Sequence, residues 1–370
     1  TRLSTGGDMG ITTIAAGWGE KGQSMPKFLR WLDEHFEKPF LVVALLLSIT
    51  LITYQVLFRY IATDIFGISG STAEVEELAI YCFIWLSYLS IPVSIKSRSN
   101  ISITVLGDRL SPRMQEVLRV ADEFVFLVFA LVMAWKCASL SYMQMQFPQY
   151  TPAMDIPYML PYLILPIGFV LMALRLLQNL FKQIRKVGAR DSLLAVAGTL
   201  VLAIPILMQW EIGIISALLG VMFACLLLGV PIAISLGVAA MAALHSTEYL
   251  NVSTMAPTCF AALDSFTLMA IFFFISAGVF MGSGGLSRQL VNLADLMVGR
   301  FVGGIAMATV ITCMFFAAIC GSGPATVAAI GAITIPAMIE RGYDKHFAAA
   351  LVACAGSIGG MIPPSTPFVV

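Results

Sequence analysis

The sequence predicts an all-α protein that crosses a membrane several times. Hydrophobic residues make up 59% of the 370 residues and charged residues only 11%, and the mean hydropathy is +0.91. Soluble domains carry about 25% charged residues. The apolar residues also fall in runs close to the ~20 residues that cross the hydrocarbon core of a bilayer as a helix. These features exclude an ordinary soluble enzyme, a disordered chain and a nucleic-acid-binding protein.

Residues 26–192 are expected to form a four-helix scaffold unit behind a flexible N-terminus at 1–25. The N-terminal segment is rich in Gly and Ser, and the segment 26–38 then carries aromatic and leucine side chains four residues apart, separated by charged ones. That spacing is typical of an amphipathic helix in the membrane interface. The four expected spans follow at 40–58, 78–95, 124–140 and 156–177.

The distribution of Lys and Arg predicts how this unit is oriented. Basic residues precede the first span, lie between the second and third spans, and follow the fourth, whereas the loops 63–75 and 147–155 contain none. Loops rich in Lys and Arg remain on the cytoplasmic side of a membrane. Both ends of the scaffold unit are therefore expected to face the cytoplasm.

Three charged residues at one edge of the predicted membrane region suggest a structural ion pair. Arg59 ends the first span, and Glu76 and Glu77 begin the second. Opposite charges on a short loop can neutralise each other at the interface, which fixes topology. A contact with a ligand or another subunit is the alternative interpretation.

The basic stretch 178–192 is the expected domain boundary, and residues 193–211 form a connecting helix that leads to a transport domain at 212–370. The run 212–243 is interrupted at Gly229–Pro231, so it is either one broken helix or two close segments. An apolar run at 266–280 precedes an amphipathic helix at 286–299. No Lys or Arg occurs between Asp191 and Ser287, so the charge rule does not orient this part.

Residues 301–339 are predicted to form a re-entrant hairpin. Two apolar arms, 301–320 and 326–339, flank a Gly-Ser-Gly-Pro-Ala tip at 321–325. The second arm has only 14 residues, or about 21 Å of helix, which is short for a full crossing. Bases stand at both ends of the pair, Arg300 before it and Arg341 after it. This arrangement favours a hairpin that enters and leaves by one face.

A broken helix is expected directly after the hairpin. The apolar segment 347–358 leads into a stretch in which Pro363, Pro364 and Pro367 remove backbone donors. Unwound backbone at membrane depth is tolerated where it is buried in protein or lines a cavity. Secondary transporters build their midplane sites from such helix breaks. Close helix packing through small residues is the alternative for each glycine-rich segment.

These residues resemble a known transporter family. The segment CGSGPATVAAIGAITIPAMIERGYDKHFAAALVACAGSIGGMIPPSTP resembles the large membrane subunit of tripartite ATP-independent periplasmic (TRAP) transporters. The segments EVEELAIYCFIWLSYLSIPVSIK and TPAMDIPYMLPYLILPIGFVLMALRLL resemble the small membrane subunit. The order of these segments resembles a fused chain, in which the small unit is followed by the connecting helix and the large unit.

The resemblance implies a function as well as a fold. It implies sodium-coupled uptake of a small organic anion, a carboxylate or a sulfonate, by an inverted-repeat elevator in the bacterial inner membrane. The anion would be delivered by a periplasmic solute-binding protein, with Na⁺ as the coupling ion and no organic cofactor. The partners implied are that protein and the lipid bilayer, and neither enzymatic activity nor a nucleic-acid partner is expected.

The resemblance also implies two sets of site residues, both in the hairpin tip and the unwound stretch. The implied sodium-binding residues are Gly321, Ser322, Gly323, Gly360, Pro363, Pro364, Ser365 and Thr366. The implied substrate-binding residues are Ser322, Pro324, Ala325, Thr326 and Ser365.

The chain contains one hairpin and one helix break, whereas the family has two of each. We therefore expect truncation within the large subunit, with a C-terminal half on the same or a separate chain supplying the other half of the site. Two other functions compete with transport. One is an ion or solute channel, which also uses re-entrant loops. The other is an intramembrane hydrolase, for which Ser322 and His346 would lie roughly 20 Å apart along a helix instead of in contact.

Overall fold

The computed structural model describes residues 37–63, 70–97, 100, 102, 110–207, 213–246, 251–320 and 323–358. Within these ranges every regular element is a helix, and the only strand-like pairing is an isolated bridge between Tyr150 and Pro157. The all-α polytopic fold class is confirmed. The expected flexible N-terminus, most of the interfacial helix and the stretch expected to unwind after 358 lie outside the described residues.

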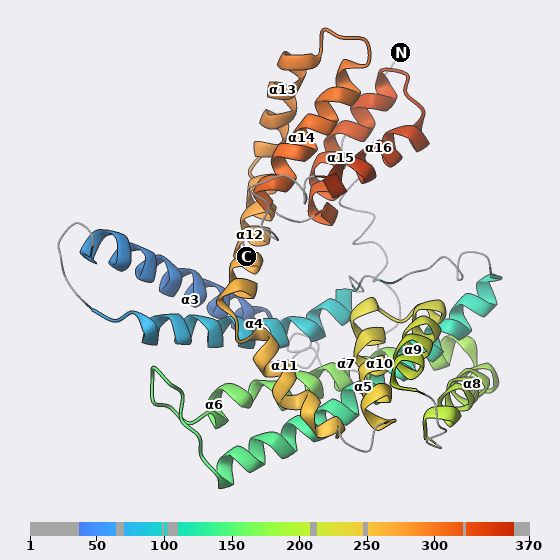
Figure 1. The fold of residues 1–370 in the computed structure, drawn as a ribbon. Helices are drawn as coiled ribbons and strands as arrows, with labels where there is room; N and C mark the ends of the chain where they lie inside the picture. Colours follow the sequence, from blue (N-terminus) through green and yellow to red (C-terminus); the bar gives the residue numbers. More distant parts are fainter. Residues whose placement is uncertain are drawn as a thin grey trace, which may run out of the picture.

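The scaffold unit consists of long helices around one apolar core (Figure 1). Its elements are α3 (Glu37–Leu57), a π-helical turn η2 (Phe58–Thr63), α4 (Ala73–Ser97), α5 (Pro112–Gln146), α6 (Met159–Tyr162) and α7 (Ile164–Val187). Inward side chains of α4, α5 and α7 make up most of the core, whereas α3 exposes most of its apolar surface. That exposed apolar surface is suited to contact lipid.

Three described helices are long and apolar enough to cross a membrane: Glu37–Ile61, Ala73–Ser97 and Met159–Val187. They contain the first and second expected spans, and the third of them covers the fourth expected span except for residues 156–158. The third expected span lies inside α5, which is not among the three. This helix has 35 residues, about 52 Å, and its first twelve residues include five charged ones. Its N-terminal part is therefore suited to extend beyond the hydrocarbon region.

The stretch 178–192 is helical on both sides of a single connecting residue. α7 continues to Val187, and α8 (Ala189–Leu207) begins after Gly188, whose φ of 94° suits glycine. The junction is held by a hydrogen bond from Ser192 Oγ to Gly188 O (2.8 Å) and by an ion pair between Arg113 and Asp191 (2.6 Å). The chain thus makes a tight turn here, and the domain boundary at 192 stays a prediction.

The run 212–243 forms two helices that pack against each other. Of the two expectations, one broken helix or two close segments, the second is confirmed. They are α9 (Ile214–Leu228) and α10 (Ile232–His245). The chain reverses at Gly229, where φ is 88°. After a short 3₁₀ turn η4 (Val252–Thr254) follow α11 (Met255–Leu263) and α12 (Phe266–Ser283), with a bend of 56° between them.

The helices α10 and α11 dock directly on the scaffold unit. Tyr88 Oη donates to the carbonyl of Cys259 (3.2 Å), and Lys136 Nζ donates to Ser253 Oγ (3.0 Å). The rings of Tyr162 and Phe260 lie 4.3 Å apart between centroids. The first helices of the expected transport domain therefore share the core of the scaffold unit.

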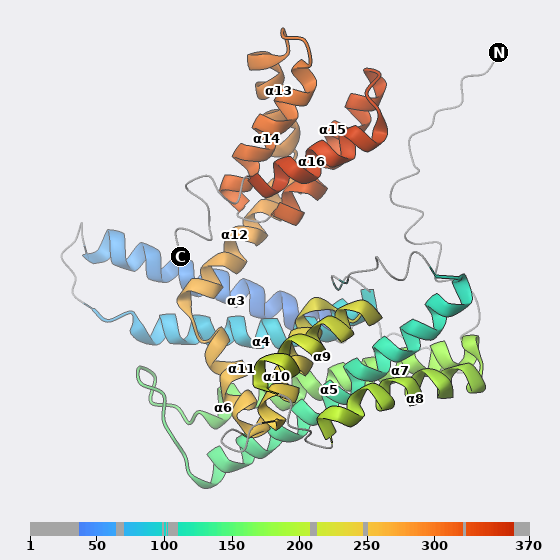
Figure 2. The ribbon, with the colours of Figure 1, turned by 45° about the vertical axis from the view of Figure 1, so that its right-hand side comes forward.

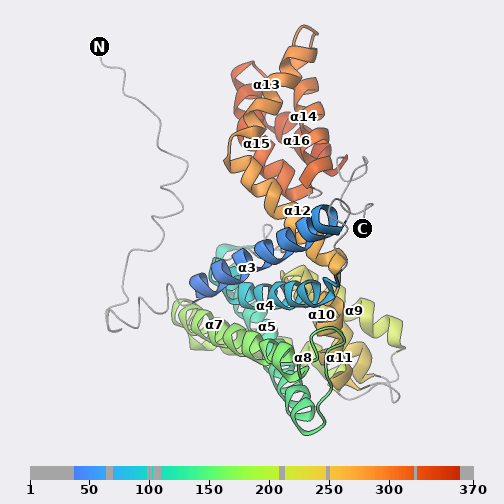
Figure 3. The same ribbon diagram turned by 90° about the vertical axis from the view of Figure 1, so that its left-hand side faces the viewer.

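The last four described helices form a group of their own, which we call the hairpin group. Its members are α13 (Leu286–Val298), α14 (Gly304–Cys320), α15 (Gly323–Glu340) and α16 (Lys345–Ile358). Figures 1, 2 and 3 show this group, in orange and red, standing apart from the scaffold unit and joined to it by α12. The helix α13 contacts α14 and α15, as an amphipathic helix with one apolar face can.

The second hairpin arm is longer than the sequence indicated. α15 has 18 residues, about 27 Å, because Gly323, Pro324 and Ala325 form its first turn instead of part of the tip. A proline at the start of a helix loses no intrahelical hydrogen bond, and its fixed φ suits the first turn. The tip is thereby reduced to Gly321 and Ser322, which lie outside the described residues.

Candidate ion and substrate site

The two segments expected to form the site meet at a pair of glycines. A methyl group built on Gly356, in the last turns of α16, would lie 2.5 Å from Cγ2 of Val327 and 3.2 Å from O of Gly323. A methyl group on Gly323 would lie 3.3 Å from O of Gly356. The absence of side chains therefore lets the first turn of α15 touch the end of α16. The start of α15 and the end of α16, from which the two predicted site segments extend, therefore lie side by side.

Three helix ends gather at this location, and they differ in polarity. α14 ends at Cys320, α15 begins at Gly323 and α16 ends at Ile358. The last turn of a helix presents carbonyl oxygens and a partial negative charge, and the first turn presents N–H groups and a partial positive charge. The arrangement thus supplies oxygens for a cation beside donors for an anion.

The hairpin arms and the segment from 347 onward carry no Asp, Glu, Lys or Arg. The sequence has no Asp, Glu, Lys or Arg in 301–339 or in 347–370, and within the described part of the chain no group of His, Cys, Asp or Glu could hold a metal ion. A weakly hydrated monovalent cation can be bound by neutral oxygens, whereas divalent ions favour carboxylates. The chemistry of this region suits Na⁺ better than Ca²⁺ or Mg²⁺.

Hydroxyl groups inside the hairpin are mostly bonded to their own helices. Thr309 donates to O of Ile305, and Thr334 donates to O of Ile330. These threonines are fully buried and serve packing within the hairpin. Thr326 is also fully buried, but it stands one turn after the start of α15, next to the glycine contact. Its position fits the predicted role at the substrate site.

The structure brings together only part of the predicted site set. Gly323 and Thr326 lie in α15, as does the backbone of Pro324 and Ala325. The remaining predicted residues lie outside the described part of the chain: Gly321, Ser322, Gly360, Pro363, Pro364, Ser365 and Thr366. Their roles as ligands stay predictions, and what the structure adds is the meeting of the two segments that carry them.

The predicted partners of Arg59 are bonded elsewhere. Arg59 lies exposed in η2, and among the described residues it makes no ion pair with Glu76 or Glu77. Glu76 instead accepts a hydrogen bond of 2.8 Å from Nε2 of Gln55. This contact joins α3 to α4 through a polar side chain that is buried in the first span.

Glu77 holds a loop that is distant in sequence. Its carboxylate accepts hydrogen bonds from N of Ala153 (3.2 Å), from N of Met154 (2.7 Å) and from Oη of Tyr81 (2.9 Å). The next residue, Asp155, has a φ of 53°, which is rare outside glycine. The charge of Glu77 thus fixes the loop between α5 and α6 on the end of α4.

A buried ion pair between Arg175 and Glu37 was not predicted from the sequence. Nε of Arg175 in α7 lies 3.0 Å from Oε1 of Glu37 at the start of α3, with side chains 10% and 6% exposed. The guanidinium also donates to Oε1 of Gln178 (3.1 Å). A signal was present, because Arg175 is the only Asp, Glu, Lys or Arg in 156–181. Charges inside membrane helices require partners.

Comparisons with known proteins match each half of the chain to a protein family. The family described as "Tripartite ATP-independent periplasmic transporters, DctQ component" matches residues 48–186. The family described as "Tripartite ATP-independent periplasmic transporter, DctM component" matches residues 219–370. The chain belongs to the TRAP transporter permeases. This TRAP permease is an integral membrane protein that carries a DctQ-like unit followed by a DctM-like unit, as the resemblance implied.

Relatives whose names state a substrate come from several bacteria. The chain is 51% identical over 348 residues to the isethionate TRAP transporter permease protein DctMQ of Oleidesulfovibrio alaskensis, covering 94% of this chain and 55% of that relative. It is 42% identical over 150 residues to the C4-dicarboxylate TRAP transporter large permease protein DctM of Rhodobacter capsulatus (40% of this chain, 34% of the relative). The corresponding protein of Vibrio cholerae is 47% identical over 146 residues (39% and 32%).

The chain therefore spans only about half the length of the fused relative that it matches. The family consists of transport proteins and not of enzymes, so membership rejects the hydrolase alternative. What the whole protein carries, and with which ion, is a separate question.

Proposed function

We propose that this TRAP permease carries out sodium-coupled uptake of a small organic anion across the bacterial inner membrane, by an elevator movement, after delivery by a periplasmic solute-binding protein. The meeting of α15 and α16 at Gly323 and Gly356 carries the proposal. It juxtaposes helix ends of opposite polarity from segments that carry no charged side chain, which is how broken helices in secondary transporters bind ions and substrates.

Sodium is the proposed coupling ion because the region offers neutral oxygens only. The C-terminal ends of α14 and α16 present backbone carbonyls, and Ser322, Ser365 and Thr366 would add hydroxyl oxygens from the segments beyond them. No organic cofactor is needed for this chemistry. A sodium gradient would then supply the free energy of uptake.

The proposed substrate is a small anion with a carboxylate or sulfonate group. The relatives include an isethionate permease and C4-dicarboxylate permeases. The isethionate relative matches across both halves of this chain, so a two-carbon sulfonate is the first candidate. The N–H groups at the start of α15 suit either anion, since helix N-termini bind sulfate, phosphate and carboxylate groups alike. Thr326 would contribute from the same turn.

The proposed movement separates the hairpin group from the scaffold unit. α13 is tied to the hairpin by contacts with α14 and by the ion pair between Asp295 and Arg341 (3.6 Å), so these helices would move as one body. α11 is bonded to the scaffold unit and would stay with it. The bend between α11 and α12 is the natural place for the change in angle. A C-terminal half of the large subunit would supply the second hairpin and break.

Uptake in proteoliposomes tests this proposal. The chain would be reconstituted with its solute-binding protein, both as these 370 residues and in a version extended to the length of the fused relative. Labelled isethionate and labelled C4-dicarboxylates would be offered with an inward sodium gradient, a potassium gradient or none. We expect accumulation by the extended version only, dependent on sodium and on the binding protein.

Three results would contradict parts of the proposal. Accumulation that is unchanged when potassium replaces sodium would reject the coupling ion. Uptake by the 370-residue chain alone would reject the need for a second half. Downhill flux without the binding protein and without accumulation would favour the channel alternative.

A further inference from the structure

Asp122 in α5 is an acidic residue that the proposed transport site does not use. Its side chain is partly exposed, but Oδ1 is buried and has no hydrogen-bond partner in the described part of the chain. A buried polar oxygen without a partner costs free energy, and the cost is much larger when the group is ionised. The packing around Asp122 therefore disfavours its charged form.

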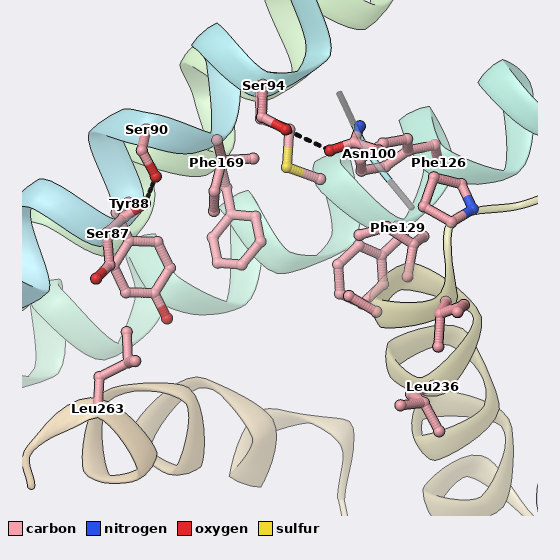
Figure 4. A pocket seen from close by; sticks show the side chains of 16 residues that line it. Ser87, Tyr88, Ser90, Ser94, Asn100, Phe126, Phe129, Phe169, Leu236 and Leu263 are labelled. Carbon is pink, nitrogen blue, oxygen red and sulfur yellow. Dashed lines mark hydrogen bonds between the residues drawn. The ribbon is translucent and has the colours of Figure 1, made fainter. Parts of the chain in front are cut away.

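The face of α5 that carries Asp122 lies against the first helices of the DctM-like unit. Phe126 and Phe129 share this face, because they follow Asp122 by four and seven residues. A methyl group on Gly237 of α10 would lie 2.8 Å from the ring of Phe129, and Phe126 lines a cavity together with Pro231. Figure 4 shows both rings at this cavity. Asp122 thus belongs to the joint between the two units.

The residue of α9 that interacts with Asp122 is Cys225. It is buried, it lies in the last turn of α9, and a charge on Asp122 acts on its thiol. The last turn of a helix carries a partial negative charge, so a carboxylate is unfavourable beside it. The sequence has no Lys or Arg between Asp191 and Ser287, so neither α9 nor α10 supplies a compensating positive charge.

The charged groups on the other neighbouring helices do not compensate Asp122 either. Glu123 follows it directly and is the one charged group among the described residues that acts on it. Arg119, one turn earlier in α5, pairs with Glu116 instead (3.4 Å). The titratable side chains of α7, α8 and α10 and of the end of α4 do not act on it: Lys96, Arg175, Lys182, Arg185, Lys186, Arg190, Asp191 and His245.

The ionisation of Asp122 is consequently shifted to neutral pH. Burial raises the pKa of Asp122 to about 7, and the like charge of Glu123 adds to this effect. Asp122 stands outside the third expected span, 124–140, in the part of α5 that is suited to extend beyond the hydrocarbon region. The basic loop before α5 places that end on the cytoplasmic side. The exposed part of the side chain can therefore exchange a proton with the cytoplasm.

We propose that protonation of Asp122 from the cytoplasm tightens the docking of α9 on α5, so that the joint between the two units responds to cytoplasmic pH. A proton adds to the carboxylate and removes the charge that is unfavourable beside the end of α9. The ionised form keeps this charge next to Cys225 and Glu123 and loosens the contact. Acidification of the cytoplasm thus holds the DctM-like unit more firmly on the scaffold unit.

The direction of the pH dependence follows from the two states of the joint. The docked state binds the proton more tightly than a loosened state, in which the hydrated carboxyl returns toward its usual pKa of about 3.9. Docking is therefore strongest at low pH and weakens by up to about tenfold for each pH unit as pH rises toward about 7. Above this value both states are ionised, and docking changes little.

Infrared spectroscopy tests proton binding without any transport assay, so its outcome is independent of the proposed function. The purified 370-residue chain would be placed in nanodiscs and titrated from about pH 5 to about pH 9. The spectrum of the wild-type chain minus that of Asp122→Asn isolates the carboxyl band of Asp122. We expect a protonated carboxyl at about pH 6 that is lost by about pH 8. An ionised Asp122 at the lower of these values would overturn the proposal.

A distance measurement tests whether the proton controls docking. Spin labels carried by unnatural amino acids would be placed at Met114 of α5 and Leu227 of α9, two exposed positions, and their separation measured by pulsed electron resonance. We expect the ratio of loosened to docked chains to rise by up to about tenfold per pH unit between about pH 5 and about pH 7. Asp122→Asn should remain docked throughout, because it cannot ionise.

Two further variants keep the test decisive. Glu74→Gln removes a carboxyl at an exposed position of α4 and should retain the wild-type pH dependence. Glu123→Gln leaves Asp122 in place and should move the infrared midpoint to lower pH, because it removes the like charge, even if Asp122→Asn misfolds. Identical distance distributions at both ends of the pH range in the wild-type chain would overturn the proposal. A pH dependence that persists in a folded Asp122→Asn variant would overturn it as well.

Discussion

The scaffold unit and the hairpin group are held together by different kinds of contact. In the scaffold unit, charged and polar side chains join segments that are far apart in sequence, such as Arg175 with Glu37 and Glu77 with the loop at 153–154. In the hairpin group, two glycines let α15 and α16 touch, no charge lies within the hairpin arms, and the ion pair of Asp295 with Arg341 is partly exposed. The first kind of contact resists movement, whereas the second leaves backbone groups available for ligands.

This difference is consistent with a static part and a binding part. A buried ion pair has one good geometry and is costly to break. Small residues let two helices approach without fixing their side chains. Four substitutions can break or sharpen this comparison, of which the buried ion pair should give the largest effect and the exposed ion pair the smallest.

Breaking the buried ion pair should have the largest effect on stability. Arg175→Met leaves Glu37 buried without its partner, and removing one member of a buried pair costs roughly 3–5 kcal/mol. The double variant Arg175→Met/Glu37→Met should recover much of this loss. Thermal unfolding in detergent would measure both. Arg119→Met is the control, since Arg119 is half-exposed and pairs only with Glu116 at 3.4 Å. Equal losses in Arg175→Met and Arg119→Met would contradict the assignment.

Filling the glycine contact should separate α15 from α16. Gly356→Ala brings a methyl group within 2.5 Å of Val327, and overpacking of this kind costs about 1–3 kcal/mol. Transport by the extended version should fall more than stability, because the site lies at the contact. Val327→Ala in the same chain should restore part of the activity.

Gly220→Ala is the matched control for this substitution. A methyl group on Gly220 in α9 would meet no atom within 4 Å, and alanine is the better helix former by about 1 kcal/mol. We expect unchanged or raised stability and unchanged uptake. If Gly356→Ala also leaves stability and uptake unchanged, the close contact between Gly356 and Gly323 is not required for transport.

Neutralising Glu77 should loosen one loop without unfolding the protein. Glu77→Gln keeps the shape of the side chain but removes the charge that receives N–H groups of Ala153 and Met154. Hydrogen bonds to charged groups contribute about 1.5–3 kcal/mol, so hydrogen exchange of these two amides should accelerate roughly tenfold or more. Glu74→Gln at an exposed position of α4 is the control. Exchange that is equal in both variants would reject the role of Glu77.

The ion pair between Asp295 and Arg341 should contribute least. Both side chains are partly exposed, and pairs of this kind contribute about 0–1 kcal/mol. Arg341→Gln should lower the melting temperature slightly at low salt and not at high salt, because salt screens exposed charges. A large loss at high salt would show that Arg341 holds α13 by packing instead.

Much of the fold was predictable because hydropathy and the positions of glycine and proline indicate where membrane helices begin and end. The helix 286–299 and the interruption at Gly229–Pro231 were placed correctly from composition and glycine positions. The predicted second hairpin arm is too short, because Gly323 and Pro324 are compatible both with a hairpin tip and with the first turn of a helix. Local sequence does not decide whether such a Gly-Pro pair ends a loop or begins a helix.

Contacts between distant segments were less predictable. The predicted partner of Glu76 was Arg59, but Gln55 donates the hydrogen bond instead. Gln55 and Arg59 are both polar residues near the end of the first span. Gln55 lies in α3 and Arg59 lies one turn later in η2, so the choice depends on how far α3 extends along α4 before the π-helical turn begins. The meeting of Gly323 with Gly356 likewise depends on tertiary packing, although the glycine positions themselves were a signal.

The single residue between α7 and α8 has a consequence for assembly. Because α7 continues through Gly188 into α8 and the DctM-like unit on one chain, the two units are synthesised together and in equal number. Their encounter is then governed by effective concentration and not by diffusion of separate subunits in the membrane. Contacts such as Tyr88 with Cys259 can therefore be weak and still hold the complex together. A lineage with separate subunits would need stronger contacts at the same interface.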